Sequence, residues 1–239
     1  MKVIQLNTWS CHLAPAIAQL FEREQPDIVC LQEVLSAEST HKLLGSIQEI
    51  LQVYPFTYSY YSPLVQFRFM ASTAQRGNMI LSKFPILSSS EFWTAGEFQA
   101  DFVQEIPYNA ARNVAHCQID TPHGLVHVLT THGYHVGAHK LGSEETVKAC
   151  RQIAHYIRSL KEPVILTGDF NLTSQSESMC VFDGLLKNLT KEYEIQTTRN
   201  YLTTKTEACD FILTRGIEEK SFTVLDDVVS DHKALVAEF

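Results

Sequence analysis

Short apolar runs alternate with amphipathic helical patterns along most of the chain. Helices are predicted over residues 13–24, 37–53, 143–160 and 176–187. The aromatic residues of 56–61 and 64–70 predict a hairpin, and residues 95–111 predict a long loop. Apolar or β-branched runs predict strands over residues 3–6, 28–32, 78–82, 86–93, 114–120, 125–131, 164–168, 210–214, 221–226 and 234–239.

Most of these predicted strands are almost continuously apolar, which indicates that both of their faces are covered. Hairpins, such as the one turning at 121–124, are mixed with strand–helix–strand units. The pattern predicts an α/β fold, a four-layer α/β/β/α sandwich of two packed mixed sheets with outer helices. No stretch rich in Pro, Gly or Ser divides the chain, so we expect a single domain over residues 1–239.

The composition is that of an ordinary globular protein, with 45% hydrophobic and 19% charged residues. The N-terminus, MKVIQLNTWS, lacks the long apolar stretch of a signal peptide, and no apolar run approaches the length of a membrane span. We therefore expect a cytoplasmic protein with no transmembrane segment and no evident obligate protein partner. The cysteines form no CxxC pair and are expected to be buried, reduced thiols: Cys11, Cys30, Cys117, Cys150, Cys180 and Cys209.

The charge balance is acidic, with 27 acidic and 19 basic residues and a net charge of −8. A protein that neutralises many phosphates of a polymer usually carries a basic face, and no Lys/Arg-rich run is present. This argues against tight, sequence-independent binding to duplex DNA. A local groove could still gather Arg68, Arg76 and Arg112, so short or single-stranded nucleic acid remains open as a partner.

Polar residues suited to phosphate chemistry recur at the ends of the predicted strands. In α/β sheets, ligand sites gather beyond the carboxyl ends of strands, so these residues can converge on one pocket. The residues that follow a strand, or stand just before the last one, are Asn7, Glu33, His132, Asp169, Asn171, Asp231 and His232.

These residue types fit metal-assisted attack of water on phosphorus. Magnesium binds oxygen ligands and typically takes only one or two carboxylates, which Glu33 and Asp231 could supply. Asp169 could orient or deprotonate the water, because that step needs a positioned carboxylate. Developing charge on phosphorus needs hydrogen-bond donors, as Asn171, His132 and His232 could be, and Asp210 is available as a carboxylate partner for a histidine.

Five segments occur in the order typical of one known family: LQEV (31–34), GNMILSKFPI (77–86), TGDFN (167–171), CDFIL (209–213) and SDH (230–232). The chain therefore resembles the endonuclease/exonuclease/phosphatase superfamily. That group includes pancreatic deoxyribonuclease, abasic-site endonucleases, neutral sphingomyelinases, inositol polyphosphate 5-phosphatases, deadenylases and tyrosyl-DNA phosphodiesterase. The resemblance covers the whole chain and implies phosphoester hydrolysis that depends on Mg²⁺ or Mn²⁺.

The resemblance also implies roles for the metal site. Glu33 would be the main metal ligand, and Asn7 and Asp231 would complete or orient the site. Asp169 would position or deprotonate the attacking water, and Asn171 would bind the phosphate.

The remaining implied roles concern the phosphoryl group. His232 would stabilise the pentacovalent phosphorus, oriented by Asp210, and His132 would contact the phosphate. His135, three residues later, falls where some members contact substrate. Arg112, at the end of the long loop, is a candidate to hold a phosphate on the grounds of its charge and fork geometry.

The sequence departs from the two best-known nuclease patterns of the family. Leu35 stands where the deoxyribonucleases have Arg, Trp9 stands where the abasic-site endonucleases have Asp, and THGYH replaces the common THL. We therefore expect a small or headgroup-like phosphodiester, or a specialised nucleic-acid end, as substrate. The alternatives are a nuclease acting on ends or single strands of DNA or RNA, and a non-catalytic binding module that retains the fold.

Other histidines and cations receive plainer interpretations. A zinc site formed by His132, His135 and His139 is disfavoured, because Gly133 and Gly137 interrupt any helix there. The remaining candidates are expected to be strand or turn histidines (His116, His123 and His127) and a solvated helix face (Lys148, Arg151 and Arg158).

Overall fold

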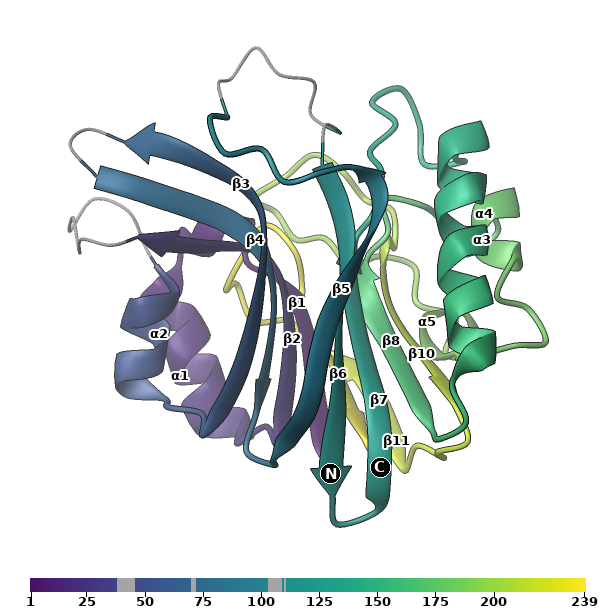
Figure 1. The fold of residues 1–239 in the computed structure, drawn as a ribbon, viewed down its shortest axis with the longest axis horizontal. Coiled ribbons are helices and arrows are strands. Elements are labelled where there is room, and N and C mark those ends of the chain that lie inside the picture. Colours follow the sequence, from purple (N-terminus) through teal and green to yellow (C-terminus); the bar gives the residue numbers. More distant parts are fainter. Residues whose placement is uncertain (38–45, 70–71, 103–108, 110) are drawn as a thin grey trace.

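In the computed structural model of the protein, two six-stranded sheets lie face to face, with helices on the outside of each (Figure 1). The structure describes residues 1–37, 46–69, 72–102, 109 and 111–239. The first sheet has the strand order β11-β12-β1-β2-β4-β3, and the second has the order β5-β6-β7-β8-β10-β9. The predicted sandwich of two packed mixed sheets with outer helices is confirmed.

The elements have the following bounds. The first sheet contains β11 (Ser221–Val224), β12 (Leu235–Glu238), β1 (Lys2–Asn7), β2 (Ile28–Ala37), β4 (Ser72–Ser82) and β3 (Tyr58–Phe69). The second contains β5 (Ile86–Gly96), β6 (Ala111–Thr121), β7 (Gly124–His132), β8 (Val164–Asp169), β10 (Asp210–Arg215) and β9 (Lys187–Asn188). The helices are α1 (Ala14–Glu24), α2 (Ile47–Val53), α3 (Glu144–Ser159), α4 (Glu177–Cys180), α5 (Leu189–Glu192) and the one-turn 3-10 helix η1 (Trp9–Cys11).

The central strands are buried on both faces because the sandwich covers them on both sides. In β1, Val3 joins the core between the two sheets, whereas Ile4 and Leu6 join the core beneath α1 and α2. Successive side chains of a strand point to opposite faces, so a strand covered on both sides reads as a continuous apolar run. Figure 1 shows α1 and α2 outside the first sheet and α3 and α4 outside the second.

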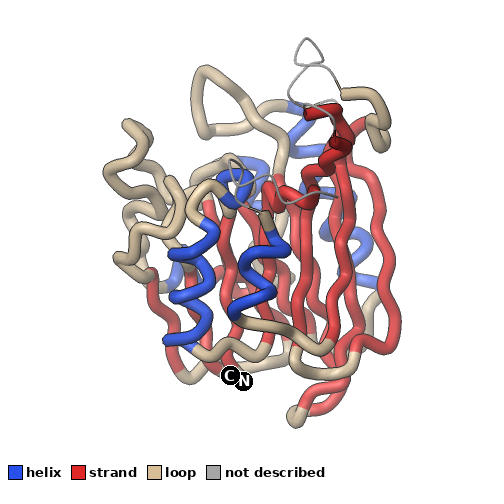
Figure 2. Tube along the Cα trace, turned by 90° about the vertical axis from the view of Figure 1, so that its left-hand side faces the viewer, coloured by secondary structure: helices blue, strands red, loops and turns tan. Residues whose placement is uncertain are grey.

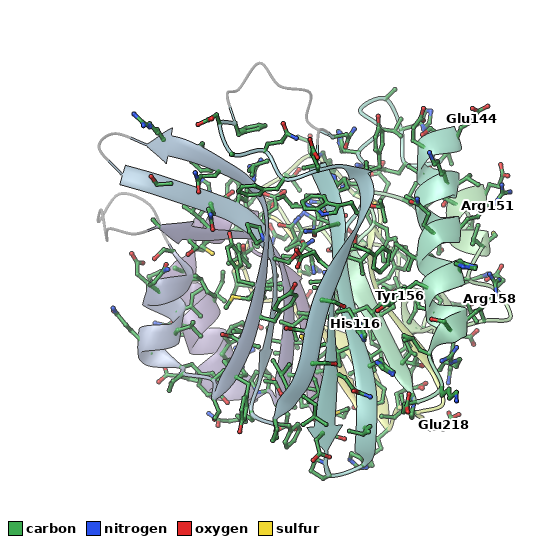
Figure 3. The ribbon with its side chains drawn as sticks, viewed as in Figure 1. His116, Glu144, Arg151, Tyr156, Arg158 and Glu218 are labelled. Carbon is green, nitrogen blue, oxygen red and sulfur yellow. The ribbon has the colours of Figure 1, made fainter. Side chains whose placement is uncertain are left out.

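Helix α3 follows its sequence pattern closely. It begins with a capping box in which Ser143 and Thr146 each bond the other's backbone N–H. Its buried side chains follow the helical spacing, among them Cys150, Ile153 and Ile157. The labelled basic side chains of Arg151 and Arg158 point away from the sheet (Figure 3) and are exposed, which confirms the predicted solvated face.

Two parallel strand pairs fix where the carboxyl ends of the central strands lie. β1 pairs with β2 and β7 pairs with β8, and the connections between them carry α1 and α3. In register, Asn7 lies opposite Gln32, and His132 lies opposite Asp169. Both pairs therefore present polar residues at their carboxyl ends.

Three predicted elements were wrong in detail. The aromatic region is not a hairpin but one long strand, β3, whose register shifts between Pro63 and Val65, so the proline marks a bulge rather than a turn. The helix expected from 37 to 53 begins only at Ile47, since β2 continues to Ala37 and residues 38–45 lie outside the described part. The helix expected over 176–187 is limited to the single turn of α4.

The cysteines match their prediction with one exception. In the structure all six are free, five are buried, and Cys180 is exposed because it ends the short α4 on the surface. Among the described residues, none of the helices has the length and apolar character needed to cross a bilayer. Figure 2 shows the two termini side by side, where the Met1 ammonium donates to the Phe239 carbonyl at 2.7 Å.

Candidate active site

The predicted site residues lie together because of the sheet topology. The carboxyl ends of β1, β7 and β8 bring Asn7, His132 and Asp169 to one region, and Glu33 reaches it from within β2. β10 runs antiparallel to β8, so its first residue, Asp210, pairs with Asp169. β12 likewise runs antiparallel to β1, so the segment that precedes it reaches the same end of the sandwich.

Glu33 is placed by a bulge rather than by the end of its strand. The register of β2 against β4 shifts between Leu31 and Val34, and Glu33 has a left-handed backbone with φ 53°. Thr8 supports the bulge, because its hydroxyl contacts the carbonyls of Gln32 and Glu33, each at 3.0 Å. Bulges re-aim side chains, and strained non-glycine residues of this kind cluster at functional sites.

The Glu33 carboxylate is buried yet favours its charged form. Burial raises its pKa, but the nearby His132, Arg76 and His232 outweigh burial and lower the pKa. Its Oε1 lies 3.5 Å from Asn7 Nδ2 and 3.8 Å from His132 Nδ1. The structure thus favours an ionised carboxylate at this position.

The Asp169 carboxylate is the meeting point of the site. Its Oδ1 accepts a hydrogen bond from the backbone N–H of Asn171 at 2.9 Å. Its Oδ2 accepts from Asn7 Nδ2 at 3.1 Å, and His232 Nε2 and His132 Nε2 lie 3.5 and 3.8 Å from the same oxygen. Burial raises the pKa of Asp169, but His232, Arg199 and His132 together hold it far below its usual range.

Lys140 fixes the orientation of two neighbouring side chains. A lysine ammonium can only donate, and its Nζ lies 2.7 Å from Asn171 Oδ1, so the amide nitrogen of Asn171 must face the other way. That nitrogen lies 3.1 Å from His132 Nε2, which therefore accepts. Burial and the nearby Arg112 lower the pKa of His132 to about 4. His132 is consequently a neutral imidazole that carries its proton on Nδ1, toward Glu33.

His232 and Asp210 form a buried pair. His232 Nδ1 lies 2.9 and 3.0 Å from the two carboxylate oxygens of Asp210, which is fully buried. Asp210 is held in turn by Gln5 at 3.2 Å and by the Thr198 hydroxyl at 2.5 Å. Burial lowers the pKa of His232, but Asp210 and Asp169 outweigh it and raise the pKa. The imidazole is thereby stabilised in its protonated form.

Arg199 lies in the same pocket and was missed by the sequence reasoning. Its guanidinium contacts His232 Nε2 and lies 3.6 Å from Asp169 Oδ2 and 3.5 Å from Asp231 Oδ2. It comes from an aperiodic stretch between α5 and β10. A single β-bridge to His232 brings it to the pocket, and no periodic pattern marks it.

Among the described residues, one group of acidic and histidine side chains lies close enough together to hold a metal ion. One ligand atom each from Asp169, Asp210 and His232 lie within 4.8 Å of one another, and all three residues are buried. Two of them, Asp210 and His232, already bond each other through Nδ1. The closeness of the three groups nevertheless allows a divalent cation to be held in this pocket, at the same edge of the sandwich as Glu33.

Comparison with models of protein families identifies the family of this chain. The model described as the endonuclease/exonuclease/phosphatase family matches residues 4–232, nearly the whole chain. The chain belongs to the endonuclease/exonuclease/phosphatase family. No curated protein sequence is a significant match.

Solved structures of this family share the fold. An endonuclease/exonuclease/phosphatase from Bacteroides vulgatus has a TM-score of 0.75 at 19% identity, covering 99% of this chain and 97% of the other. A mannosyl-6-phosphatase from Bacteroides thetaiotaomicron has a TM-score of 0.73 at 17% identity, covering 100% and 98%. A humanized D. rerio TDP2 has a TM-score of 0.69 at 14% identity, covering 99% and 97%. Members of the family are generally phosphoesterases.

Two further predicted site residues lie at the edge of the family pocket. Arg112 is buried, and its Nε and Nη1 donate to the carbonyls of Gly133 and Ala111, each at 2.9 Å. The backbone N–H and carbonyl of half-buried His135 are both bonded by the Asn109 side chain, at 2.8 and 2.7 Å. Arg112 and Asn109 thus hold the segment that follows β7, and His135 is part of that segment.

Proposed function

We propose that the chain is a Mg²⁺- or Mn²⁺-dependent hydrolase of phosphate esters in which water attacks phosphorus in line. The observation that carries this proposal is the convergence on Asp169 Oδ2 of Asn7, His132 and His232, contributed by separate segments of both sheets. A phosphoryl group in this pocket would find a carboxylate, two imidazoles and amide donors around it. The pocket thus supplies the groups that the reaction needs.

The residues present fit a hard divalent cation. Glu33 offers an ionised carboxylate that is 15% exposed, and the side chain of Asp231 is 17% exposed, so both retain some access to solvent. Asn7 turns its amide nitrogen toward Glu33 and Asp169, which suits it to orient the two carboxylates. A bound Mg²⁺ or Mn²⁺ would polarise the phosphoryl oxygen and neutralise charge that develops there.

Asp169 and His232 would perform the remaining steps. Asp169 has a strongly lowered pKa, so its carboxylate is a weak base. It is therefore better suited to orient the attacking water by accepting a hydrogen bond than to remove and hold a proton of that water. A new oxygen–phosphorus bond forms as the ester bond breaks, and the proton of the water passes to solvent while the leaving oxygen is protonated. His232, kept charged by Asp210, would donate to the pentacovalent phosphorus group, with Asn171 and His132 beside it.

For the substrate, we propose a phosphodiester, with a nuclease activity on ends or single strands as the alternative. The net charge of −8 argues against a protein that tracks duplex DNA. The named relatives include both a phosphatase and TDP2, so the family admits more than one kind of ester. We place Arg112 and His135 at the substrate side of the pocket, since Arg112 supports the segment after His132 and His135 belongs to that segment.

The test is a panel of phosphodiesters, phosphomonoesters, oligonucleotides and sphingomyelin, each assayed with Mg²⁺, Mn²⁺ or EDTA. The expected result is metal-dependent hydrolysis of at least one diester, abolished by EDTA and restored by the metal. The matched control is the Asp169→Asn protein purified in the same way, which excludes a contaminating hydrolase. Binding of substrates without turnover by the wild-type protein would instead support the non-catalytic module.

A further inference from the structure

Arg199 has a buried guanidinium, which is costly for a protein to maintain. Its side chain is 3% exposed, and it lies among groups from two other segments: Asp169 at the end of β8, and Asp231 and His232 before β12. A buried arginine requires compensating partners, because a charge that is removed from water loses its hydration. The question is therefore what this charge is held in place to bind.

The backbone around Arg199 is tied in place on both sides. The Thr198 hydroxyl donates to Asp210 Oδ2 at 2.5 Å, and the Thr198 carbonyl accepts from Lys233 N–H at 2.8 Å. Asn200 Nδ2 donates to the Ser230 carbonyl at 2.6 Å. The residues on either side of Arg199 are thus fastened to the strand-end segments that carry Asp210 and His232, so its side chain is aimed into the pocket by a rigid support.

The contacts of the guanidinium are looser than those of a dedicated structural ion pair. Its closest carboxylate contacts are 3.6 Å to Asp169 and 3.5 Å to Asp231. Tight Arg–carboxylate pairs have distances of about 2.7 to 2.9 Å and often use two parallel bonds. Both oxygens of Asp169 already accept hydrogen bonds, from Asn171 and Asn7. Apart from its contact with His232 Nε2, the guanidinium is therefore not held in a tight pair with either carboxylate, and it faces the space between these groups.

That space is where the reacting phosphorus must lie if the proposed function holds. A phosphoryl group within reach of Asp169 and His232 is also within reach of Arg199, because the guanidinium contacts both. Arg199 Nη1 and His232 Nε2 lie side by side, and an anionic phosphoryl oxygen beside them would accept hydrogen bonds from both side chains. A planar guanidinium matches two phosphoryl oxygens at once.

We propose that Arg199 is a further catalytic residue, which binds the non-bridging oxygens of the phosphoryl group and stabilises their charge in the transition state. This inference rests on the proposed function, whose residues define the position of the phosphorus. It assigns a role to the stretch between α5 and β10, which the sequence motifs leave out. Arg199 would then be the only cation in the described residues that contacts Asp169, Asp231 and His232 together.

The experiment measures binding of inorganic phosphate, free of turnover, alongside binding of Mn²⁺ alone. The proteins are the wild type, Arg199→Gln, Arg199→Lys and, as a matched control, Arg23→Gln, which removes an exposed arginine paired with Asp227. Arg199→Gln should weaken phosphate binding roughly ten- to a hundredfold, the scale of a hydrogen bond to a charged group. Its kcat should fall roughly a hundredfold or more, as for other removed charge-stabilising donors. Arg23→Gln should match the wild type in both.

Measuring Mn²⁺ binding distinguishes a phosphate-binding role of Arg199 from a role in which it only balances the charge of the carboxylates. Arg199 lies beside Asp169 and Asp231, so its removal should leave Mn²⁺ binding unchanged or tighter while phosphate binding weakens. In Arg199→Ala, added guanidinium should restore kcat in a saturable way, which a purely structural role does not predict. Unchanged phosphate affinity in Arg199→Gln, with only a lower melting temperature, would overturn the proposal.

Two measurements keep the test decisive. If Arg199→Gln does not fold, Arg199→Lys keeps the charge but loses the fork, and wild-type phosphate affinity in that variant contradicts the proposal. In the wild type, phosphate should shift the NMR signals of the buried guanidinium, and unshifted signals at saturating phosphate also contradict it. Wild-type protein that hydrolyses no ester sinks the proposed function itself, whereas an active wild type with a fully active Arg199→Gln sinks only this inference.

Discussion

Two clusters that contain buried histidines differ in how their polar groups are hydrogen-bonded. The first, which we call the relay cluster, consists of Tyr156, His116, His127 and Glu162, and it lies between the second sheet and α3. Tyr156 Oη lies 2.9 Å from His116 Nδ1, His116 Nε2 lies 2.8 Å from His127 Nδ1, and His127 Nε2 lies 2.9 Å from Glu162. Figure 3 shows the labelled His116 and Tyr156 meeting between β6 and α3.

The relay cluster is internally complete. If the tyrosine hydroxyl donates to the first ring, each ring donates through Nε2, and the carboxylate accepts at the end, one assignment of protons satisfies every link. The predicted strand histidines His116 and His127 therefore have a packing role, joining α3 to the sheet. Fully satisfied buried networks of this kind rigidify a structure.

In the second cluster, around Asp169, most contacts to the Oδ2 atom are longer than hydrogen bonds. Four groups approach Asp169 Oδ2 at distances from 3.1 to 3.8 Å, and three of them lie at 3.5 Å or beyond. Two of its supporting residues, Glu33 and Asn171, have left-handed backbones. The comparison indicates that the relay cluster satisfies its own hydrogen bonds, whereas the cluster around Asp169 leaves three groups at 3.5 Å or more from Asp169 Oδ2, an arrangement that suits the proposed function.

The largest expected effect comes from removing the proposed metal ligand. Glu33→Ala should weaken Mn²⁺ binding by more than the roughly 10- to 100-fold typical of residues that only support a ligand. Activity at fixed metal should fall to near the level in EDTA, while the melting temperature changes little. Calorimetric titration of Mn²⁺ checks this, with Glu33→Gln as the isosteric control for shape. Full activity of exhaustively dialysed wild-type protein in EDTA would contradict the metal requirement altogether.

The next largest effect is expected at the two residues that flank the phosphorus. Asp169→Asn and His232→Ala should each lower kcat by roughly a hundredfold or more, because each removes a positioned group that acts on the reacting atoms. Steady-state kinetics on a substrate found in the panel, together with thermal unfolding, checks both. A variant that keeps near wild-type kcat removes its residue from the mechanism.

A smaller effect, a loss in the free energy of unfolding, should arise from the relay cluster when the pH falls. Burial and the neighbouring His127 lower the pKa of His116 to about 4, whereas the unfolded chain titrates near 6.5. Between these values only the unfolded chain takes up the proton, so stability is complete above about pH 6.5 and is lost on acidification toward pH 4. Between pH 7.5 and 5 this loss is about 2 kcal/mol for the one group.

Urea unfolding at pH 7.5 and 5 measures that loss. The pKa values of His132 and His135 are also lowered, to about 4, so the informative quantity is the difference between wild type and His116→Gln. The variant should lose about 2 kcal/mol less over this interval. Equal losses in the two proteins would show that His116 does not titrate as its burial implies.

The smallest effect is expected from Tyr156→Phe, which removes only the hydroxyl that donates to His116. The free energy of unfolding should fall by about 1 kcal/mol, the typical net value of a buried hydrogen bond. The kcat should stay at the wild-type value, since Tyr156 belongs to α3 and not to the pocket. Loss of activity without loss of stability would mean that the two clusters are coupled.

The sequence was most informative where strands end, because apolar runs followed by a polar residue locate a sheet edge. Asn7, His132 and Asp169 were found in this way, and parallel pairing does bring them together. Glu33 was found for a partly wrong reason, since β2 continues past it and a bulge, which no periodicity reveals, turns it toward the pocket.

The sequence was least informative where tertiary contacts alone place a residue. Arg199 reaches the pocket through one bridge to His232, and Lys140 reaches Asn171 from an irregular segment before α3. Neither segment has a repeating pattern of apolar positions, so only the folded structure shows that these cations are buried beside the carboxylates. The two aromatic stretches were mistaken for a hairpin because nothing in their pattern shows that one strand passes through both with a bulge at Pro63.

Gly168 is required by the fold, whereas its neighbour Asp169 belongs to the proposed active site. A Cβ atom on Gly168 would lie 2.1 Å from the Thr131 carbonyl oxygen, so β7 and β8 can pair here only if this position carries no side chain. The next residue, Asp169, has no such restriction, and in the proposed function its carboxylate orients the attacking water. A protein of this fold without that activity could replace the aspartate but would still need the glycine. In TGDFN the glycine is therefore required by the pairing of β7 and β8, and the aspartate by the proposed reaction.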